Sequence, residues 1–576
     1  MKLIYMQPDT NLPEAYLKAV AKSAGCKTKE EIGEFLNPRP PIHNTISSLP
    51  DYKKAVICLK DAVRTQKKIV IFGDYDCDGI TALVQLMDFI NAITGLEKHS
   101  WFIPNRMADN YGLTLSGLKR CIDLYDPQLL ICVDCGSNSI SEIDWLKNKG
   151  IKCIVIDHHN VVSSDKPHPA AAHLNPKAFD VKNPSIDKLT TMSASGLAFL
   201  FCEQYAKDES ITNWNRNRSL LLAGLGTLAD VMPLVGINRA LLKHSLILAN
   251  NEKELERIPG LVALKNVSGT NKVNSNTYGF QWGPRLNALG RLEDANISVK
   301  LLLSKTVKDA EPLAEKCNEA NTERKNIQDK ILDKSIAEAR SLMNIHRPKV
   351  IILNNKSWHT GVVGIVASKI KEKFNRPAII CGWNKDKGCW IGSGRSVHGF
   401  DLGEATNSAV KKGILLNGGG HKMACGLSFD TKHLTELRNW MNDKCLLTEE
   451  DFMPSYIILG NIFDQSEEVW INIYEHLRPF GNGNPEPLLY ARGLLMWSGE
   501  NKTKENVVWS IKGGFRCEDG PDKLIYFTWK NIEQAMKKWQ NGADYQMVFS
   551  ISESVKEYPD GKKTYYNWDV KDCESV

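Results

Sequence analysis

The sequence contains no run of about 18 consecutive apolar residues, the length that a membrane-spanning helix needs. Its first residues, MKLIYMQPDTNLPEAY, also contain no long apolar segment of the kind found in a secretory leader. Neither a membrane protein nor a secreted one is therefore expected. We expect a soluble, cytoplasmic protein without a membrane partner.

A paired cysteine motif of the zinc-finger type is also missing. Of the 15 cysteines, only Cys132 and Cys135 form a CxxC pair, and no second pair is present to complete a structural zinc site. The cysteines are therefore expected to be buried thiols in a reducing compartment. A strong charge excess is absent as well, because the net charge of +6 permits a nucleic-acid partner without requiring one.

What the sequence does have is length, with 576 residues of ordinary globular composition, 42% hydrophobic and 24% charged. A chain of this size exceeds one hydrophobic core, so several domains are expected.

The segment Lys68 to Leu83, KIVIFGDYDCDGITAL, predicts a buried strand, a turn and a helix. Ile69 to Phe72 form an apolar, β-branched run that is typical of a core strand. The carboxylates Asp74, Asp76 and Asp78 follow directly. Clustered carboxylates at the end of a core strand are costly unless they are neutralised, so the segment indicates a divalent cation. A solvated acidic turn is the alternative.

Two further core strands end in residue types that bind metals. Gln128 to Val133 is followed by Asp134, and Lys152 to Ile156 is followed by Asp157-His158-His159. Strands that alternate with helices imply a parallel sheet, and the carboxyl ends of parallel strands share the edge where ligands gather. We therefore expect these side chains to meet, although the histidines alone could form a surface or capping pair.

Asp230 is a fourth candidate ligand, because it is the only charged residue in the apolar stretch Leu222 to Leu234. A buried lone aspartate needs a partner, and a metal cluster would supply one. Carboxylate and imidazole ligands suit Mn²⁺ or Mg²⁺, and the absence of thiolates among them argues against structural zinc.

These motifs resemble a known family. DYDCDG (74–79), VDCG (133–136), DHH (157–159) and GTLAD (226–230) resemble the four motifs of the DHH phosphoesterase superfamily. WGPRLNALGR (282–291), GSGRS (392–396), GGGHKMACG (418–426) and FGNGNPEP (480–487) resemble motifs of its RecJ family, the single-strand-specific 5′→3′ exonucleases. MSASG (192–196) departs from the glycine-rich version of that helix start which is usual in the family.

The resemblance implies a ligand set and catalytic residues. Two Mn²⁺ ions, with Mg²⁺ as the alternative, would be held by Asp76, Asp78, Asp134, His158 and Asp230, with Asp134 bridging the ions. Catalytic roles beside the metals fall to Asp74, Asp157 and His159, the last facing the scissile phosphate or the leaving oxygen.

The resemblance also implies a set of substrate-binding residues. Ser393 and Arg395 match positions that receive a 5′-terminal phosphate, with Arg106 and either Arg285 or Arg291 nearby. The full expected set is Arg106, Arg285, Asn287, Arg291, Ser393, Arg395, Ser396 and His421. A pocket for a terminal phosphate explains exonuclease behaviour, because it engages an end rather than the middle of a strand.

We expect an α/β fold with a parallel-sheet DHH phosphoesterase domain, a long helical connector, a DHH-associated α/β domain and a C-terminal β-barrel of the OB type. Aromatic residues interleaved with lysines in the C-terminal strands suit a barrel that stacks bases and tracks phosphates. The expected boundaries are 1–60 for an N-terminal lead-in, 61–255 for the DHH domain, 256–345 for the connector, 346–446 for the DHH-associated domain and 447–576 for the OB-type domain.

The resemblance favours a manganese-dependent exonuclease that degrades single-stranded DNA from its 5′ end to mononucleotides, in DNA repair and recombination. One alternative is a DHH phosphodiesterase for short oligonucleotides or cyclic dinucleotides. Another is a catalytically inactive DNA-binding scaffold. A monomer is expected, and candidate partners are a helicase and a single-strand-binding protein, which the sequence does not identify.

Overall fold

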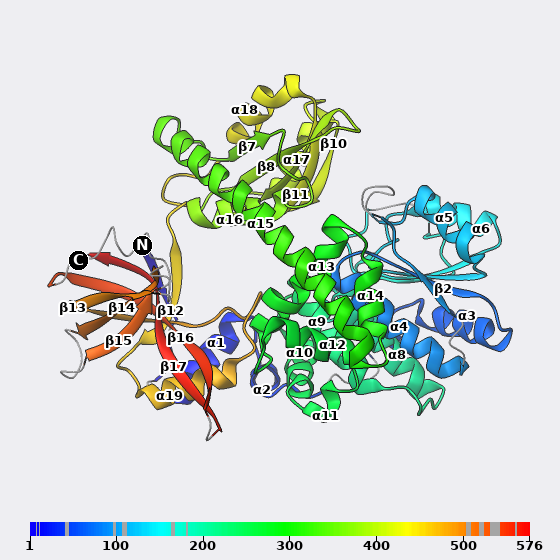
Figure 1. The fold of residues 1–576 in the computed structure, drawn as a ribbon, viewed down its shortest axis with the longest axis horizontal. Helices are drawn as coiled ribbons and strands as arrows, with labels where there is room; N and C mark the ends of the chain where they lie inside the picture. The colour runs from blue at the N-terminus through cyan, green and yellow to red at the C-terminus, as the bar shows by residue number, and fades with distance from the viewer. Residues whose placement is uncertain are drawn as a thin grey trace. The chain divides into compact units, whose positions relative to one another are not determined.

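The chain forms two compact units in the computed structural model (Figure 1). The larger unit contains residues 3–318 and 456–576, and the smaller unit contains residues 1–2 and 319–455. The structure describes the whole chain except residues 7, 11, 41–44, 96–98, 106–111, 163–166, 180–182, 503–507, 518–523, 530–541, 559–560 and 576.

A five-stranded parallel sheet lies at the centre of the first part of the larger unit. Its order is β3-β2-β4-β5-β6, and every neighbouring pair is parallel, as expected. The three apolar runs that the sequence predicted as core strands form its central strands, β2, β4 and β5. The five strands are β2 (Ile69–Gly73), β3 (Ser100–Phe102), β4 (Leu129–Val133), β5 (Lys152–Ile156) and β6 (Ala172–Leu174).

Helices cover both faces of this sheet, because successive side chains of a buried strand point to opposite faces. On one face, α5 (Leu115–Tyr125) and α6 (Ile140–Asn148) pack on a core that includes Val70, Leu130 and Val155. The helices α3 (Tyr52–Arg64), α4 (Cys77–Thr94) and α8 (Ala194–Asp208) also pack against strands of the sheet.

The helices that follow extend this domain and lead out of it. The long helix α15 is 39 residues, about 58 Å at 1.5 Å per residue, and its second half packs in the core of the smaller unit. The helical elements are α7 (Pro184–Asp187), α9 (Arg216–Ala229), α10 (Gly236–Ala249), α11 (Glu252–Leu255), α12 (Pro259–Ser268), η3 (Thr277–Trp282), α13 (Gly283–Leu292), α14 (Asn296–Leu303) and α15 (Val307–Ile345).

The smaller unit is built on a mixed five-stranded sheet in the order β10-β11-β9-β8-β7, in which only the β7–β8 pair is parallel. Its strands are β7 (Ile351–Asn355), β8 (Ala378–Asn384), β9 (Cys389–Arg395), β10 (Asn417–His421) and β11 (Ala424–Phe429). Its helices are α16 (Val363–Phe374), α17 (Leu402–Lys411) and α18 (Leu434–Lys444).

The last part of the larger unit is a β-barrel. Five strands form a closed ring, because β13 pairs with both β14 and β16, and β15 and β17 complete the circuit. A five-stranded barrel is consistent with the OB-type expectation. The strands are β12 (Ser455–Asn461), which leads into the ring, β13 (Leu488–Lys502), β14 (Val508–Cys517), β15 (Leu524–Trp529), β16 (Asp544–Tyr558) and β17 (Gly561–Ser575).

The first helices of the chain belong with this C-terminal part. Tyr16 of α1 (Pro13–Ser23) and Phe35 of α2 (Lys29–Leu36) share a core with Trp470 and Tyr474 of α19 (Glu467–Leu477). Strand β1 (Lys2–Tyr5) adds to the same sheet beside β12. The N-terminal segment thus packs against residues that follow it by more than 400 positions in the sequence (Figure 1). Among the described helices, none has the length and apolar character needed to cross a membrane.

Candidate metal centre

The ends of three neighbouring parallel strands carry the candidate ligands. Gly73 pairs in register with Val133, and Val133 pairs with Ile156, so β2, β4 and β5 end at the same edge of the sheet. The next residues, Asp74, Asp134 and Asp157, are each no more than 2% exposed. The strand-end argument from the sequence is therefore confirmed in its geometry.

Ligand atoms of the candidate residues cluster in three overlapping groups, in each of which they lie within 4.8 Å of one another. Seven side chains contribute: three carboxylates come from the strand ends and the turn, one from α4 and one from the end of α9, and the other two side chains are the histidine pair. The groups are Asp134 with His158 and His159, Asp78 with His158 and Asp230, and Asp74 with Asp76 and Asp134.

His158 lies at the middle of this cluster. Its Nε2 atom is 3.2 Å from Asp134 Oδ1, 3.5 Å from Asp230 Oδ2 and 3.8 Å from Asp78 Oδ2. Asp230 joins the strand-end residues although it comes from a different element, as its isolation in an apolar stretch predicted. All five expected ligands are brought together.

The tight turn after β2 depends on Gly79 and Asp76. A Cβ atom at Gly79 would lie 2.7 Å from the Asp74 carbonyl oxygen, so no larger residue fits there without movement. Asp76 Oδ1 accepts hydrogen bonds from the N–H groups of Asp78 (3.0 Å) and Gly79 (3.1 Å), and thereby caps α4. Asp76 therefore shapes the turn as well as lying among the ligands.

Asp78 is held by the beginning of α8, which the sequence analysis did not foresee. Its carboxylate accepts hydrogen bonds from the backbone N–H groups of Ala194 (2.8 Å) and Ser195 (3.0 Å). Ser193 caps this helix through the N–H of Gly196. The side chains of MSASG, which differ from the usual family pattern, do not affect this contact with Asp78, because backbone N–H groups make it.

Asp157 and His159 form a hydrogen-bonded pair beside the cluster. Asp157 Oδ1 accepts from His159 Nδ1 at 2.7 Å, and Asp157 Oδ2 accepts from the N–H of Ser137 at 3.0 Å. Burial would raise the pKa of Asp157, but the hydrogen bond and charge of His159 hold it well below its usual range. Conversely, burial lowers the pKa of His159, and the hydrogen bond and charge of Asp157 outweigh this and raise it to about 9.

The buried carboxylates of the cluster repel one another. Burial raises the pKa of Asp134 and of Asp230 well above the ordinary value of an aspartate, and the neighbouring aspartates raise it further. The same two causes, burial first, raise the pKa of Asp78 to about 7. A site that concentrates buried negative charge in this way favours a bound cation. The donors are oxygen and imidazole nitrogen, and no described cysteine belongs to the three groups, so the set fits Mn²⁺ or Mg²⁺.

Lys177 is a residue near this centre that the sequence analysis missed. Burial lowers the pKa of its ammonium group, while Asp157 and Asp230 raise it, so the lysine lies within electrostatic range of both. Its backbone N–H donates to Asn175 Oδ1, and Asn175 Nδ2 in turn donates to the carbonyl oxygen of His159. No sequence signal indicated this residue, because a single lysine after a proline has no distinctive pattern.

Helix α13, which carries the GPRLNALGR motif, supports the metal-binding turn. Asn287 Oδ1 accepts a 2.6 Å hydrogen bond from the N–H of Cys77. A Cβ atom at Gly290 would lie 2.6 Å from the carbonyl oxygen of Tyr75, so the glycine allows close packing of the helix on the turn. The structure thus gives Asn287 a positioning contact, and its expected contact with substrate stays a prediction.

The arginines of this motif differ in their surroundings. Arg285 donates from Nε to Asn318 Oδ1 (3.1 Å) and from Nη1 to the carbonyl oxygen of Gln281 (2.9 Å). Arg291 lies in the last turn of α13 and is partly exposed. Arg106 falls outside the described residues. The choice among these arginines as phosphate ligands stays open.

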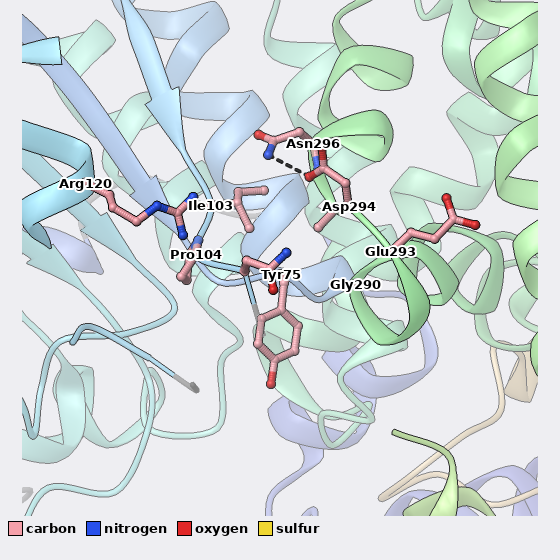
Figure 2. A pocket seen from close by; sticks show the side chains of 10 residues that line it. Tyr75, Ile103, Pro104, Arg120, Gly290, Glu293, Asp294 and Asn296 are labelled. Carbon is pink, nitrogen blue, oxygen red and sulfur yellow. Dashed lines mark hydrogen bonds between the residues drawn. The ribbon is translucent and has the colours of Figure 1, made fainter. Parts of the chain in front are cut away.

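A cavity of about 210 Å³ lies where this helix meets the turn (Figure 2). Figure 2 shows Arg120 of α5 on one side and Asp294 and Asn296, which follow α13, on the other. Asn296 Nδ2 donates to Asp294 Oδ1 at 2.7 Å, and Asn296 Oδ1 accepts from Trp101 Nε1 at 3.0 Å. Asp294 and Asn296, two of the polar residues that line the cavity, are therefore hydrogen-bonded to each other.

The smaller unit contains the expected phosphate-binding pair. Arg395 Nη1 donates to Ser393 Oγ (3.0 Å) and to the carbonyl oxygen of Gly394 (2.8 Å) at the end of β9. A Cβ atom at Gly364, in the first turn of α16, would lie 2.9 Å from Ser393 Oγ and 3.4 Å from Arg395 Nη2. A helix start, a hydroxyl group and a guanidinium group therefore meet, which is a combination suited to an anion.

The other two expected residues of this unit are placed differently. Ser396 is 1% exposed, and its hydroxyl donates to the carbonyl oxygen of Phe400 at 2.8 Å. The hydroxyl thus fixes its own turn, and the expected contact of Ser396 with substrate stays a prediction. His421 is exposed at the end of β10, and its role stays a prediction.

Comparison with known proteins supports the family assignment. Residues 68–225 match the DHH family N-terminal domain, and residues 347–445 match the DHHA1 domain. The single-stranded-DNA-specific exonuclease RecJ of Dickeya dadantii is 30% identical over 517 residues, which cover 85% of this chain and 86% of that protein. The chain belongs to the RecJ family.

Other RecJ proteins extend this likeness. RecJ of Haemophilus influenzae is 32% identical over 80% of this chain and 82% of its own length. RecJ of Bacillus subtilis is 31% identical over 83% of this chain, and the match spans only 59% of that longer protein. The fold agrees with Mn²⁺-bound RecJ of Thermus thermophilus, with a TM-score of 0.77 at 24% identity over all of this chain and 79% of that one.

The metal expectation agrees with RecJ structures. Another exonuclease RecJ bound to manganese matches with a TM-score of 0.57 and 28% identity, over 70% of this chain and 97% of that chain. RecJ of Thermus thermophilus has also been solved with Mg²⁺. Mn²⁺, with Mg²⁺ as the alternative, is the cofactor that both the RecJ family and the donor set of this centre indicate.

Proposed function

We propose that this chain is a metal-dependent exonuclease that hydrolyses single-stranded DNA from its 5′ end and releases mononucleotides. The observation that carries the proposal is the meeting of Asp78, Asp134, His158 and Asp230 within ligand distance at one sheet edge. The relatives named above are single-stranded-DNA-specific exonucleases.

In this proposal two Mn²⁺ or Mg²⁺ ions would be held by Asp76, Asp78, Asp134, His158 and Asp230. The ions supply activation of a water molecule and stabilisation of the charge that builds on the phosphate oxygens. The backbone amides of α8 orient Asp78, and the turn capped by Asp76 fixes its approach. Asp74 lies against the same cluster.

His159 acts on the substrate beside this centre. Asp157 Oδ1 accepts a hydrogen bond from His159 Nδ1, with 2.7 Å between these two atoms, so the ring is oriented and Nε2 is the nitrogen that can donate a proton to the scissile phosphate or the leaving oxygen. Asp157 is therefore a positioning residue for His159. Lys177 adds positive charge near the same place.

Recognition of the strand end is assigned to Ser393 and Arg395. A 5′-terminal phosphate has one more exposed oxygen than an internal phosphodiester. A guanidinium group can donate a forked pair of hydrogen bonds to such a phosphate. Arg106, Arg291 and His421 are further proposed contacts with the strand. Unwound strands would come from a helicase or from a single-strand-binding protein, and the enzyme would act as a monomer.

The test is a cleavage assay on strands labelled at the 5′ or the 3′ end, with matched duplex DNA as the control substrate. Addition of MnCl₂ should release labelled mononucleotides first from the 5′ end of single strands, and EDTA should stop the reaction. Internal cuts or release from the 3′ end would contradict the proposal.

Two alternatives are distinguished in the same assay. An enzyme for short oligonucleotides would cut dinucleotides and leave long strands intact, and the closed barrel of β13 to β17 would then have no evident use. An inactive scaffold would bind strands without cutting them. The assembled ligand set argues against that scaffold, because all five expected ligands are present.

A further inference from the structure

The residue after the metal ligand Asp230 has an unusual backbone conformation. Asp230 ends α9 as its C-cap, and Val231 follows with φ +58°. This left-handed region is rare for residues other than glycine and is least favourable for β-branched ones. The Val231 side chain is 62% exposed, so packing of that side chain does not hold the conformation. Within the helix end, the N–H of Met232 donates to the carbonyl oxygen of Thr227 at 3.2 Å, and a second contact reaches the backbone from outside the helix.

A loop from the C-terminal part of the chain makes that contact. Asn482 Nδ2 donates a 2.8 Å hydrogen bond to the carbonyl oxygen of Val231, and the N–H of Leu234 donates to the carbonyl oxygen of Asn482 at 2.7 Å. Asn482 thus bridges both sides of the turn that leaves Asp230. The two residues are 251 positions apart in the sequence.

Two glycines of the FGNGNPEP segment permit this close approach. A Cβ atom at Gly481 would lie 2.7 Å from Leu234 Cδ1, and one at Gly483 would lie 3.2 Å from Pro233 Cβ. Gly483 also has φ +73°, which glycine adopts without strain. The motif therefore allows Asn482 to contact the turn closely, and side chains in place of the two glycines would prevent that contact.

The loop that carries Asn482 is itself firmly held. Asn484 is fully buried and donates from Nδ2 to the carbonyl oxygens of Leu477 (2.9 Å) and Pro479 (2.8 Å). The guanidinium group of Arg239, buried on α10, donates to the carbonyl oxygens of Leu477, Arg478 and Pro479. A rigid loop of this kind can impose a conformation on the turn that it contacts.

We propose that Asn482 is a positioning residue for the metal site, which holds the Val231 turn in its strained conformation and thereby aims the Asp230 carboxylate at His158 and Asp78. The inference rests on the proposed function, in which Asp230 is a metal ligand. It assigns to the FGNGNPEP segment a role in metal binding in addition to its role as a connection to the barrel. Groups that orient metal ligands commonly change metal affinity by tenfold or more when they are removed.

The test measures Mn²⁺ binding to the full chain by titration calorimetry, together with thermal unfolding in EDTA. Asn482→Ala should weaken the affinity of one Mn²⁺ site by about tenfold. The matched control is Asn472→Ala, which removes an exposed asparagine from α19 and should bind Mn²⁺ like the wild type. Wild-type affinity in Asn482→Ala would overturn the proposal.

A second variant separates positioning from a general loss of structure. Val231→Gly relieves the strained φ angle, so Asn482→Ala combined with Val231→Gly should recover part of the lost Mn²⁺ affinity. A double variant as weak as Asn482→Ala alone, or weaker, would show that the strained turn is not what Asn482 holds.

Asp230→Ala tests the underlying ligand assignment. It should remove one Mn²⁺ site outright. Wild-type Mn²⁺ binding by Asp230→Ala would show that the proposed ligand set is wrong, and the role of Asn482 would fall with it. Loss of a site in Asp230→Ala with no effect of Asn482→Ala would overturn the positioning role alone.

Discussion

Asp134 is a buried carboxylate whose charge is unfavourable in the metal-free protein and which we propose as a metal ligand. It is 2% exposed and faces the carboxylates of Asp74, Asp76, Asp78 and Asp230, which raise its pKa after the larger effect of burial. Its φ of +60° also puts it in a sparsely populated backbone region. A cation that binds only the folded chain relieves the repulsion and stabilises the fold by linkage.

Asp134→Asn should therefore abolish hydrolysis while leaving the melting temperature in EDTA unchanged or higher, because one repelling charge is removed. MnCl₂ should stabilise the wild type, by about 2.7 kcal/mol at a concentration 100 times the Kd, but not the variant. Thermal unfolding with EDTA and with MnCl₂ checks both statements. The control is Asp144→Asn, at an exposed position of α6. A variant that still cuts DNA near the wild-type rate would refute the ligand assignment.

Arg395 is the residue on which recognition of the strand end is proposed to depend. Lysine would keep the positive charge and lose the fork that grips a terminal phosphate. Because a charged contact of this kind contributes on the order of 1.5–3 kcal/mol, Arg395→Lys should slow cleavage of 5′-phosphorylated strands roughly tenfold to a hundredfold.

The advantage of 5′-phosphate over 5′-hydroxyl strands should narrow with the Arg395→Lys change. Paired rate measurements on two oligonucleotides that differ only in the 5′ group provide the readout, and Arg340→Lys on an exposed position of α15 is the control. An unchanged phosphate preference would place end recognition at Arg106 or Arg291 instead.

At the scale of elements, the packing of α13 on the turn after β2 makes glycine more favourable than alanine at one position of the helix. Glycine inside a helix is usually about 1 kcal/mol less favourable than alanine. At Gly290, however, the added methyl group would lie 2.6 Å from the Tyr75 carbonyl oxygen. Gly290→Ala should therefore lower the free energy of unfolding by about 1–3 kcal/mol and weaken Mn²⁺ binding.

The comparison for Gly290→Ala is Gly279→Ala in η3, where the new methyl group would meet Leu228 at an ordinary 3.9 Å. Thermal unfolding and Mn²⁺ titration of both variants decide the matter. Equal stability of the two would mean that α13 shifts away from the turn at little cost.

Elements of the site were predictable from the sequence where a side chain reports its own surroundings. The apolar runs before Asp74, Asp134 and Asp157 predicted both the strands and their shared edge, and the isolation of Asp230 predicted its place beside them. The domain order and the C-terminal barrel followed in the same way from strand patterns and motif resemblance.

What the sequence did not predict are contacts made by backbone atoms or across long separations. The amides of Ala194 and Ser195 hold Asp78, and any residue could supply them. Asn287, read as a substrate ligand, accepts a bond from Cys77 210 positions away. The hydrogen bond from the Ser396 hydroxyl to the Phe400 carbonyl oxygen was not predicted, because a serine in a glycine-rich turn has the same sequence pattern whether its hydroxyl faces a phosphate or a backbone carbonyl group.

For the whole molecule, the barrel is expected to add phosphate contacts along a long DNA strand and so to strengthen its binding. Lys512 and Arg516 are both exposed on β14 and lie four positions apart, an even spacing that puts them on the same face of the strand. Replacing both with alanine should weaken binding to long strands and lower the slope of log affinity against log salt by about 0.7 per lost phosphate contact.

Cleavage of very short strands, which do not reach the barrel, should be unaffected by the Lys512→Ala and Arg516→Ala changes. Binding titrations at several salt concentrations, on a long and a very short strand, measure both effects. The comparison is Lys18→Ala with Lys22→Ala on exposed positions of α1. Equal losses on the two substrates would point to a structural role for these residues.

The packing of α1 and α2 on α19 has a consequence for synthesis of the chain on the ribosome. Tyr16 and Phe35 emerge first, but Trp470 and Tyr474, which bury them, are translated more than 400 residues later. At 5–20 residues per second, the apolar face of the first two helices stays uncovered for roughly 20–90 s. During that interval the nascent segment is a natural binding site for chaperones, and the larger unit can close only when translation is nearly finished.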